Sequence, residues 1–95
     1  MKPDTLPAKY VLTVYNAIDE EPGITLSRKE FPFLSWALKE LAQSFENDLK
    51  AFRSRNGYFP DTGEHLYGDC VQLSYETSPY CFRYFTVKRI EKEER

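Results

Sequence analysis

Apolar and aromatic residues occupy both alternating sets of positions between Lys9 and Ile18. This segment is rich in β-branched and aromatic side chains, which favours an extended strand. One face of that strand would carry Tyr10, Leu12, Val14 and Ile18, and the other face Val11, Thr13, Tyr15 and Ala17. Apolar side chains on both faces indicate an inner strand of a sheet.

The next segment, Asp19–Gly23, predicts a turn, because its Pro and Gly suit the two central positions of a type II turn. After the turn, Ile24–Leu26 returns as a short second strand in the interpretation we favour. The alternative is a helix that begins at Ser27–Glu30, which has the pattern of a capping box. Pro32 would then lie inside the helix, so a helix that begins near Phe31 is less strained.

The clearest pattern is an amphipathic helix between Phe31 and Arg53. Its apolar residues recur at steps of three, four and seven, on one side of the helix: Leu34, Leu38, Leu41, Phe45, Leu49 and Phe52. The opposite side carries Lys39, Gln43, Glu46, Asn47 and Lys50. We expect the helix to end at Asn56-Gly57, because Gly readily adopts the left-handed conformation that terminates helices. Arg53 and Arg55 suit the negative end of the helix dipole.

Two further strands are predicted at Cys70–Glu76 and Tyr80–Ile90, joined by a turn at Thr77–Pro79, whereas Tyr58–Gly68 is expected to form a loop. A turn centred on Ser78-Pro79 pairs Val71 with Thr86, Leu73 with Tyr84, and Tyr75 with Phe82. We expect the helix to pack on the face that these side chains share. It also places Cys70 opposite Val87 and Cys81 opposite Glu76. The two thiols would then lie several residues apart, so no internal disulfide is expected.

Together these elements predict a single α+β domain, in which one long amphipathic helix packs on an antiparallel sheet of three or four strands. The order along the chain is strand, optional second strand, helix, strand, strand. A length of 95 residues suits one small domain. We expect a loose lead-in over residues 1–8 and a frayed, charged tail over residues 91–95.

Composition narrows the class of protein. Hydrophobic residues make up 41% and charged residues 29%, which excludes a disordered chain. The longest uncharged stretches resemble Tyr10–Ile18 in length, far short of the ~20 residues of a membrane helix, so no membrane contact is expected. No C-x-x-C motif and no secretory signal occur, so we expect a reduced, cytoplasmic protein.

No group of residues predicts catalysis. His65 is the only histidine, and the spacing of its acidic and cysteine neighbours matches no zinc site. We expect it to be a loop imidazole. Phosphate-binding glycine motifs and the G-x-S-x-G motif are also absent. We therefore expect no enzyme, no cofactor and no metal site.

The aromatic content of 16% is high, and two rings fall outside the apolar stripe of the helix. Trp36 points to the opposite side, and Phe33 lies about 100° from the stripe. Either segment 19–31 covers these rings, or they form an exposed contact site. We interpret the chain as a non-enzymatic module that binds another protein or protein complex. The predicted contact residues are Phe33, Trp36, Glu40, Tyr58 and Phe59, with Glu40 steering a basic partner.

The alternative is an RNA- or DNA-binding domain, because rings and cations interleave along the last strand, as in sheets that stack bases. Its surface would use Arg53, Arg55, Arg83, Phe85, Lys88 and Arg89. A net charge of −2 argues against this class, whose members usually carry a basic patch. Small size, acidity and missing motifs are also common among small inhibitors that phages and mobile elements direct against host defence systems such as CRISPR. An anti-defence inhibitor is therefore a class-level hypothesis, and the sequence indicates no oligomeric state.

Overall fold

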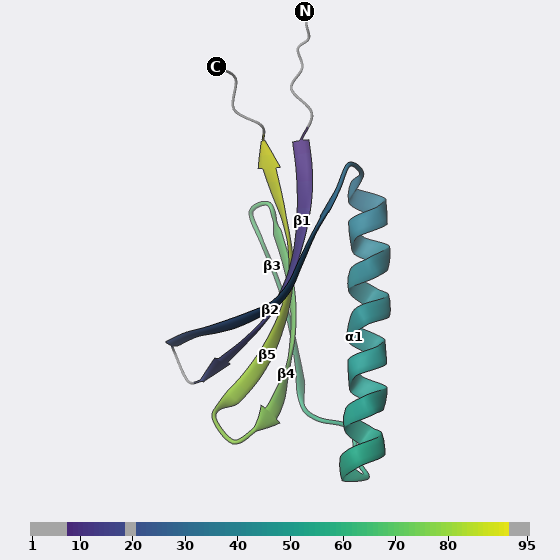
Figure 1. The fold of residues 1–95 in the computed structure, drawn as a ribbon, viewed down its shortest axis with the longest axis vertical. Helices are drawn as coiled ribbons and strands as arrows, with labels where there is room; N and C mark the ends of the chain where they lie inside the picture. Colours follow the sequence, from purple (N-terminus) through teal and green to yellow (C-terminus); the bar gives the residue numbers. More distant parts are fainter. Residues whose placement is uncertain (1–7, 19–20, 92–95) are drawn as a thin grey trace, which may run out of the picture.

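The computed structural model describes residues 8–18 and 21–91, which form five strands and one helix (Figure 1). In chain order these are β1 (Ala8–Ile18), β2 (Glu21–Phe31), α1 (Leu34–Asn56), β3 (Thr62–Tyr67), β4 (Cys70–Ser78) and β5 (Cys81–Glu91). The strands pair antiparallel in the spatial order β2-β1-β5-β4-β3. The predicted α+β class is confirmed, but the sheet has five strands rather than three or four.

The prediction of a loop over Tyr58–Gly68 is wrong, since Thr62–Tyr67 forms the strand β3. It pairs with β4 from Thr62 opposite Tyr75 to Tyr67 opposite Cys70. A tight turn at Gly68 and Asp69 joins the two strands, and Gly68 has a positive φ of 54°. β3 is an edge strand that α1 hardly covers, so most of its side chains on both faces are exposed to water. No buried face imposes a hydrophobic alternation on its sequence.

The inner position predicted for the first strand is confirmed, since β1 lies between β2 and β5. The segment after it is a strand, so the alternative helix start at Ser27 is wrong. β2 is also longer than the predicted Ile24–Leu26, and its register with β1 shifts between Val14 and Tyr15 and again before Ala17. Residues 21–23 of the expected turn belong to β2, whereas residues 19–20 lie outside the described residues. Of the expected lead-in and tail, Ala8 and Glu91 belong to strands, and residues 1–7 and 92–95 are not described.

The helix follows its predicted boundaries closely. Phe33 is extended, with φ −127° and ψ 139°, and α1 begins at the next residue, so Pro32 lies before the helix, where its ring causes no clash. At the other end, Gly57 has a φ of 83°, and its N–H donates to the carbonyl oxygen of Arg53 at 2.7 Å. The predicted stop at Asn56-Gly57 is therefore confirmed.

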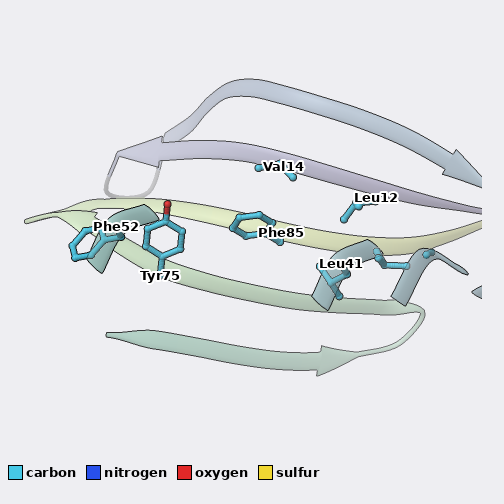
Figure 2. Packing of buried hydrophobic residues seen from close by; sticks show 8 residues of the cluster. Leu12, Val14, Leu41, Phe52, Tyr75 and Phe85 are labelled. Carbon is cyan, nitrogen blue, oxygen red and sulfur yellow. The ribbon is translucent and has the colours of Figure 1, made fainter. Parts of the chain in front are cut away.

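The core lies between α1 and one face of the sheet (Figure 2). Its buried side chains are Leu12, Val14, Ala37, Leu41, Phe52, Tyr75, Phe85 and Val87. The Phe45 ring packs edge-on against Phe85 at 5.3 Å and against Tyr75 at 6.2 Å between ring centroids. Such edge-to-face pairs add to the stabilisation from buried apolar area. A few large rings therefore close this small core.

The predicted register between β4 and β5 is wrong by one residue. Val71 pairs with Val87, Leu73 with Phe85, and Tyr75 with Arg83. The turn lies one residue further along, at Pro79-Tyr80, with Tyr80 at a positive φ of 66°, and the register shifts before Ser78. Side chains alternate along a strand, so a slip of one residue moves every side chain to the other face.

As a result, the face of β5 that packs on α1 is the opposite of the one predicted from the sequence. Phe85 and Val87 face the helix, whereas Tyr84 and Thr86 lie on the other face. Cys70 is paired with Lys88 and Cys81 with Ser78, and both cysteines are free. Among the described residues, no helix is long and apolar enough to cross a membrane.

Candidate interaction surfaces

Phe33 and Trp36 form an exposed aromatic pair at the N-terminal end of α1. Their ring centroids lie 4.9 Å apart in an edge-to-face arrangement, and each residue is 55% exposed. Phe33 is the N-cap residue, and Trp36 follows in the first helical turn. β2 ends at Phe31, runs beside β1 as an edge strand, and leaves both rings exposed. The alternative in which segment 19–31 covers these rings is therefore wrong for the described part, residues 21–31.

Glu40, the third predicted contact residue, is engaged within the molecule. Its Oε2 accepts hydrogen bonds from Lys29 Nζ at 2.9 Å and from the Ser44 hydroxyl at 3.4 Å. The bond from Lys29 is the main reason why the pKa of the Glu40 carboxyl is lowered. The contact joins α1 to β2, and it offsets part of the charge that would steer a basic partner.

Tyr58 and Phe59 are also exposed, but they follow the C-terminal end of α1. Tyr58 packs edge-on against Phe52 at 5.4 Å between centroids, and the Arg53 guanidinium lies 5.1 Å from the Phe59 ring centroid. A helix of 23 residues is about 35 Å long. The structure therefore separates the predicted contact rings into two patches at opposite ends of α1.

The residues predicted for nucleic-acid binding do not form one surface. Phe85 is 1% exposed and lies in the core, so it is not available to stack on a base. Arg83 faces the helix, where its Nη1 bonds to Asp48 Oδ2 at 2.8 Å and its Nε donates to Asn16 Oδ1 at 2.9 Å. The observed register places Phe85 and Arg83 on the face that α1 covers, so their assignment to a nucleic-acid-binding surface is wrong.

The four remaining cations of that set are scattered. Arg53 and Arg55 lie in the last turn of α1, whereas Lys88 and Arg89 lie near the end of β5, at the opposite end of the sheet (Figure 1). Successive residues of a strand point to opposite faces, so Lys88 and Arg89 do not act together. Arg89 also forms an ion pair with Glu91 at 3.1 Å. No continuous basic patch results from these residues.

The sheet face away from α1, which we call the open face, carries three aromatic rings that are not among the predicted site residues. Tyr15 and Tyr84 stack at 5.2 Å between centroids, and Phe82 lies 6.2 Å from Tyr84. Partial burial, followed by the proximity of Tyr84 and Cys70, raises the pKa of the Tyr15 hydroxyl. The sequence held a usable signal, because Phe85 and Val87 form a more apolar pair than Tyr84 and Thr86, and the more apolar set faces a helix.

A groove with a volume of about 350 Å³ lies between the first turn of α1 and the β3–β4 hairpin. Leu34 of α1 and Leu66 of β3 line it on two sides and are 44% and 72% exposed. Val71 and Val87 also line the groove, and Asp69 and Arg89 supply its charged groups. Its lining is mostly apolar, which suits an apolar side chain better than an ion.

The described part of the chain holds no group of three or more His, Cys, Asp or Glu that could bind a metal ion. His65 is exposed and lies in β3 opposite Gln72, so the prediction that it lies in a loop is wrong. Comparisons with protein-family models, curated proteins and solved structures found no match for the chain.

Proposed function

We propose that the chain is a non-enzymatic protein-interaction module that binds another protein through the Phe33–Trp36 pair. The observation that carries this proposal is the 55% exposure of two large rings that contact each other at the N-terminal end of α1. Trp is enriched among the residues that dominate binding energy at protein interfaces, and adjoining apolar area marks a contact site.

The surroundings of the pair also match a protein contact site. Leu34, next to Phe33 in the chain, adds exposed apolar area. The Lys29–Glu40 ion pair links β2 to the same helix and supplies polar groups close by in the sequence. An apolar centre with polar groups at its margin is the usual anatomy of an interface.

The two rings contribute little to the core, which explains why a binding role is the better account of them. The buried positions of α1 are Ala37, Leu41 and Phe52. We expect Trp36→Ala to change the free energy of unfolding by about 1 kcal/mol or less, as at other exposed positions. A loss of about 3 kcal/mol or more, typical of a core aromatic residue, would show that Trp36 packs the fold.

The test is an affinity pull-down from cells that express the chain, with the captured protein identified by mass spectrometry. We expect Trp36→Ala and Phe33→Ala to reduce capture at least tenfold, while thermal unfolding changes little. Tyr80→Ala is the matched control, because Tyr80 is an exposed ring in the β4–β5 turn, at the other end of the sheet. Equal capture by Trp36→Ala and the wild-type chain would refute the assignment of the anchor.

An inhibitor of a host defence complex, encoded by a phage or mobile element, is the narrower hypothesis within this class. Its support is the small size and the net charge of −2. Co-expression of the chain with a CRISPR system that targets a phage should restore plaques, and Trp36→Ala should abolish that effect. Unchanged immunity with the wild-type chain would refute the narrower hypothesis for that system.

A further inference from the structure

We infer that the groove beside the first turn of α1 docks an amphipathic helix of the protein partner, and that this helix carries basic residues on its flank. The inference rests on the proposed function and names the kind of partner segment that would bind. It concerns a surface on the opposite side of α1 from the Glu40–Lys29 contact, between Leu34 and Leu66.

α1 covers only part of the sheet. Five strands spaced about 4.8 Å apart span about 19 Å between the outer strand axes, whereas a helix is about 10 Å wide. Within residues 8–18 and 21–91, α1 packs mainly against β1, β5 and β2. Figure 2 shows the core over β1, β5 and β4, with β3 at the edge beyond it. The sheet therefore has width for a second helix beside α1.

The part of the sheet that α1 leaves uncovered has an apolar lining. Leu66, Val71 and Val87 are cross-strand neighbours in β3, β4 and β5, and they share the face that α1 covers elsewhere. Val87 is buried, but Leu66 is 72% exposed, and Leu34 faces the same groove from α1. A partner helix with apolar residues at helical spacing would bury both leucines at once.

The charged residues around the groove favour a basic partner. Glu64 lies on the same face of β3 as Leu66, and Asp69 lies in the turn that follows. Both are exposed, and the described residues provide neither with an ion pair. Arg89, the cation that lines the groove, is already paired with Glu91. The uncompensated charge is negative, which favours Lys or Arg on the flank of the partner helix.

A second copy of this chain does not supply such a helix. The outward side of α1 is polar, with Lys39, Gln43, Glu46, Asn47 and Lys50, and the chain carries a net charge of −2. An extended partner segment would pair with the free edge of β3 instead and would leave the groove unfilled. The experiment below distinguishes a partner helix from three other occupants: a second copy of the chain, an extended partner segment, and residues 1–7 of the chain itself.

The probe is a synthetic peptide of about 20 residues, built from Leu and Lys with Leu at the i, i+3, i+4 and i+7 positions of a helix. Binding to the full chain is followed by fluorescence anisotropy and mapped by the amide resonances of the protein. We expect saturable binding, a helical peptide by circular dichroism, and resonance changes centred on Leu34, Leu66 and Val71. A matched peptide with Glu in place of Lys should bind at least tenfold more weakly.

Leu66→Asp should weaken binding of the Leu/Lys peptide at least tenfold. Ile24→Asp is the matched control, since Ile24 is equally exposed on the opposite edge strand, β2, and this change should have no effect. The double change Glu64→Lys and Asp69→Lys should reverse the preference toward the Glu peptide. Circular dichroism of each variant protein checks that the fold is kept.

Several outcomes would overturn the inference. One is an equal loss of peptide affinity in Leu66→Asp and Ile24→Asp. Another is a set of resonance changes centred on the open face. A bound peptide that is extended, or dimerisation of the chain without peptide, would also contradict it. Tighter peptide binding by a chain that lacks residues 1–7 would show that this segment occupies the groove, which also contradicts the inference. If Trp36→Ala loses the captured partner while Leu66→Asp keeps it, the proposed function stands and the groove assignment fails.

Discussion

The Nη1 atom of Arg83 lies 2.8 Å from the Oδ2 atom of Asp48, a contact that joins β5 to α1. The same oxygen accepts a hydrogen bond from the Tyr75 hydroxyl at 2.9 Å, and Arg83 Nε donates to Asn16 at 2.9 Å. One carboxylate on the helix therefore organises polar side chains from three neighbouring strands. These groups are partly shielded from water, so their loss is felt more than the loss of a surface ion pair.

The first prediction concerns this network. Asp48→Asn removes the counter-charge of Arg83 and should lower the free energy of unfolding by about 1 kcal/mol, a value reduced because both side chains are about one-third exposed. Urea denaturation measures the change. The control is Glu46→Gln, which removes an exposed pair with Lys50 and should cost less than about 0.5 kcal/mol. Equal losses in the two variants would contradict a special role for Asp48.

The second prediction concerns alkaline pH. Burial, followed by the Asp48 carboxylate, raises the pKa of the Tyr75 hydroxyl from 10.0 to about 12. The folded state therefore favours the protonated phenol, a contribution that is complete below pH 10 and lost as the pH rises toward about 12. Because water screens part of this shift, the contribution to the free energy of unfolding is about 1–2 kcal/mol.

Urea denaturation from about pH 9 to about pH 12 tests this contribution, because stability should fall less steeply there in Tyr75→Phe than in the wild-type chain. Tyr80→Phe, which alters an exposed ring, should leave the fall unchanged. An identical pH profile for Tyr75→Phe and the wild-type chain would show that Tyr75 titrates normally.

The third prediction tests the register of β5 with adjacent residues. Phe85→Ala empties a core position and should cost about 3–5 kcal/mol, whereas Tyr84→Ala on the open face should cost about 1 kcal/mol. Thermal or urea unfolding of both variants is the measurement. A larger loss for Tyr84→Ala would instead support the register first predicted from the sequence.

The fourth prediction concerns the end of the helix. Gly57 has a φ of 83°, and a Cβ atom there would meet no other atom within 4 Å. The cost of Gly57→Ala is therefore backbone strain alone, about 1 kcal/mol, measured by urea unfolding. Ser54→Ala, in the exposed last turn of the same helix, should be close to neutral or slightly stabilising. A neutral Gly57→Ala would contradict the left-handed C-terminal cap.

The fifth prediction concerns the nucleic-acid alternative. Because Phe85 is buried, Arg83 is paired with Asp48, and the other cations lie at opposite ends of the sheet, we expect no saturable binding of single-stranded RNA or DNA near physiological salt. Fluorescence anisotropy with a labelled oligonucleotide is the measurement. Saturable binding that weakens steeply with added salt and is lost in Tyr84→Ala would support a stacking role for the open face.

Local chemistry made much of the architecture predictable. The helix could be placed because its apolar stripe repeats at helical spacing over five turns and because Gly57 suits the left-handed cap. The inner position of β1 could be inferred because both its faces carry apolar side chains. The exposed pair Phe33 and Trp36 could be suspected because both rings deviate from the stripe, although the sequence left open whether another segment covers them.

Period, turn chemistry and capping act between near neighbours along the chain, so they were enough to identify α1 and the strands β1, β4 and β5. The fifth strand, the face that Phe85 shares with the helix, and the separation of Trp36 from Tyr58 became visible only in the folded chain. An edge strand such as β3 gains its stability from pairing with β4, and a register depends on which side chains the helix buries. Those free energies arise between residues far apart in the chain, so a local pattern does not contain them.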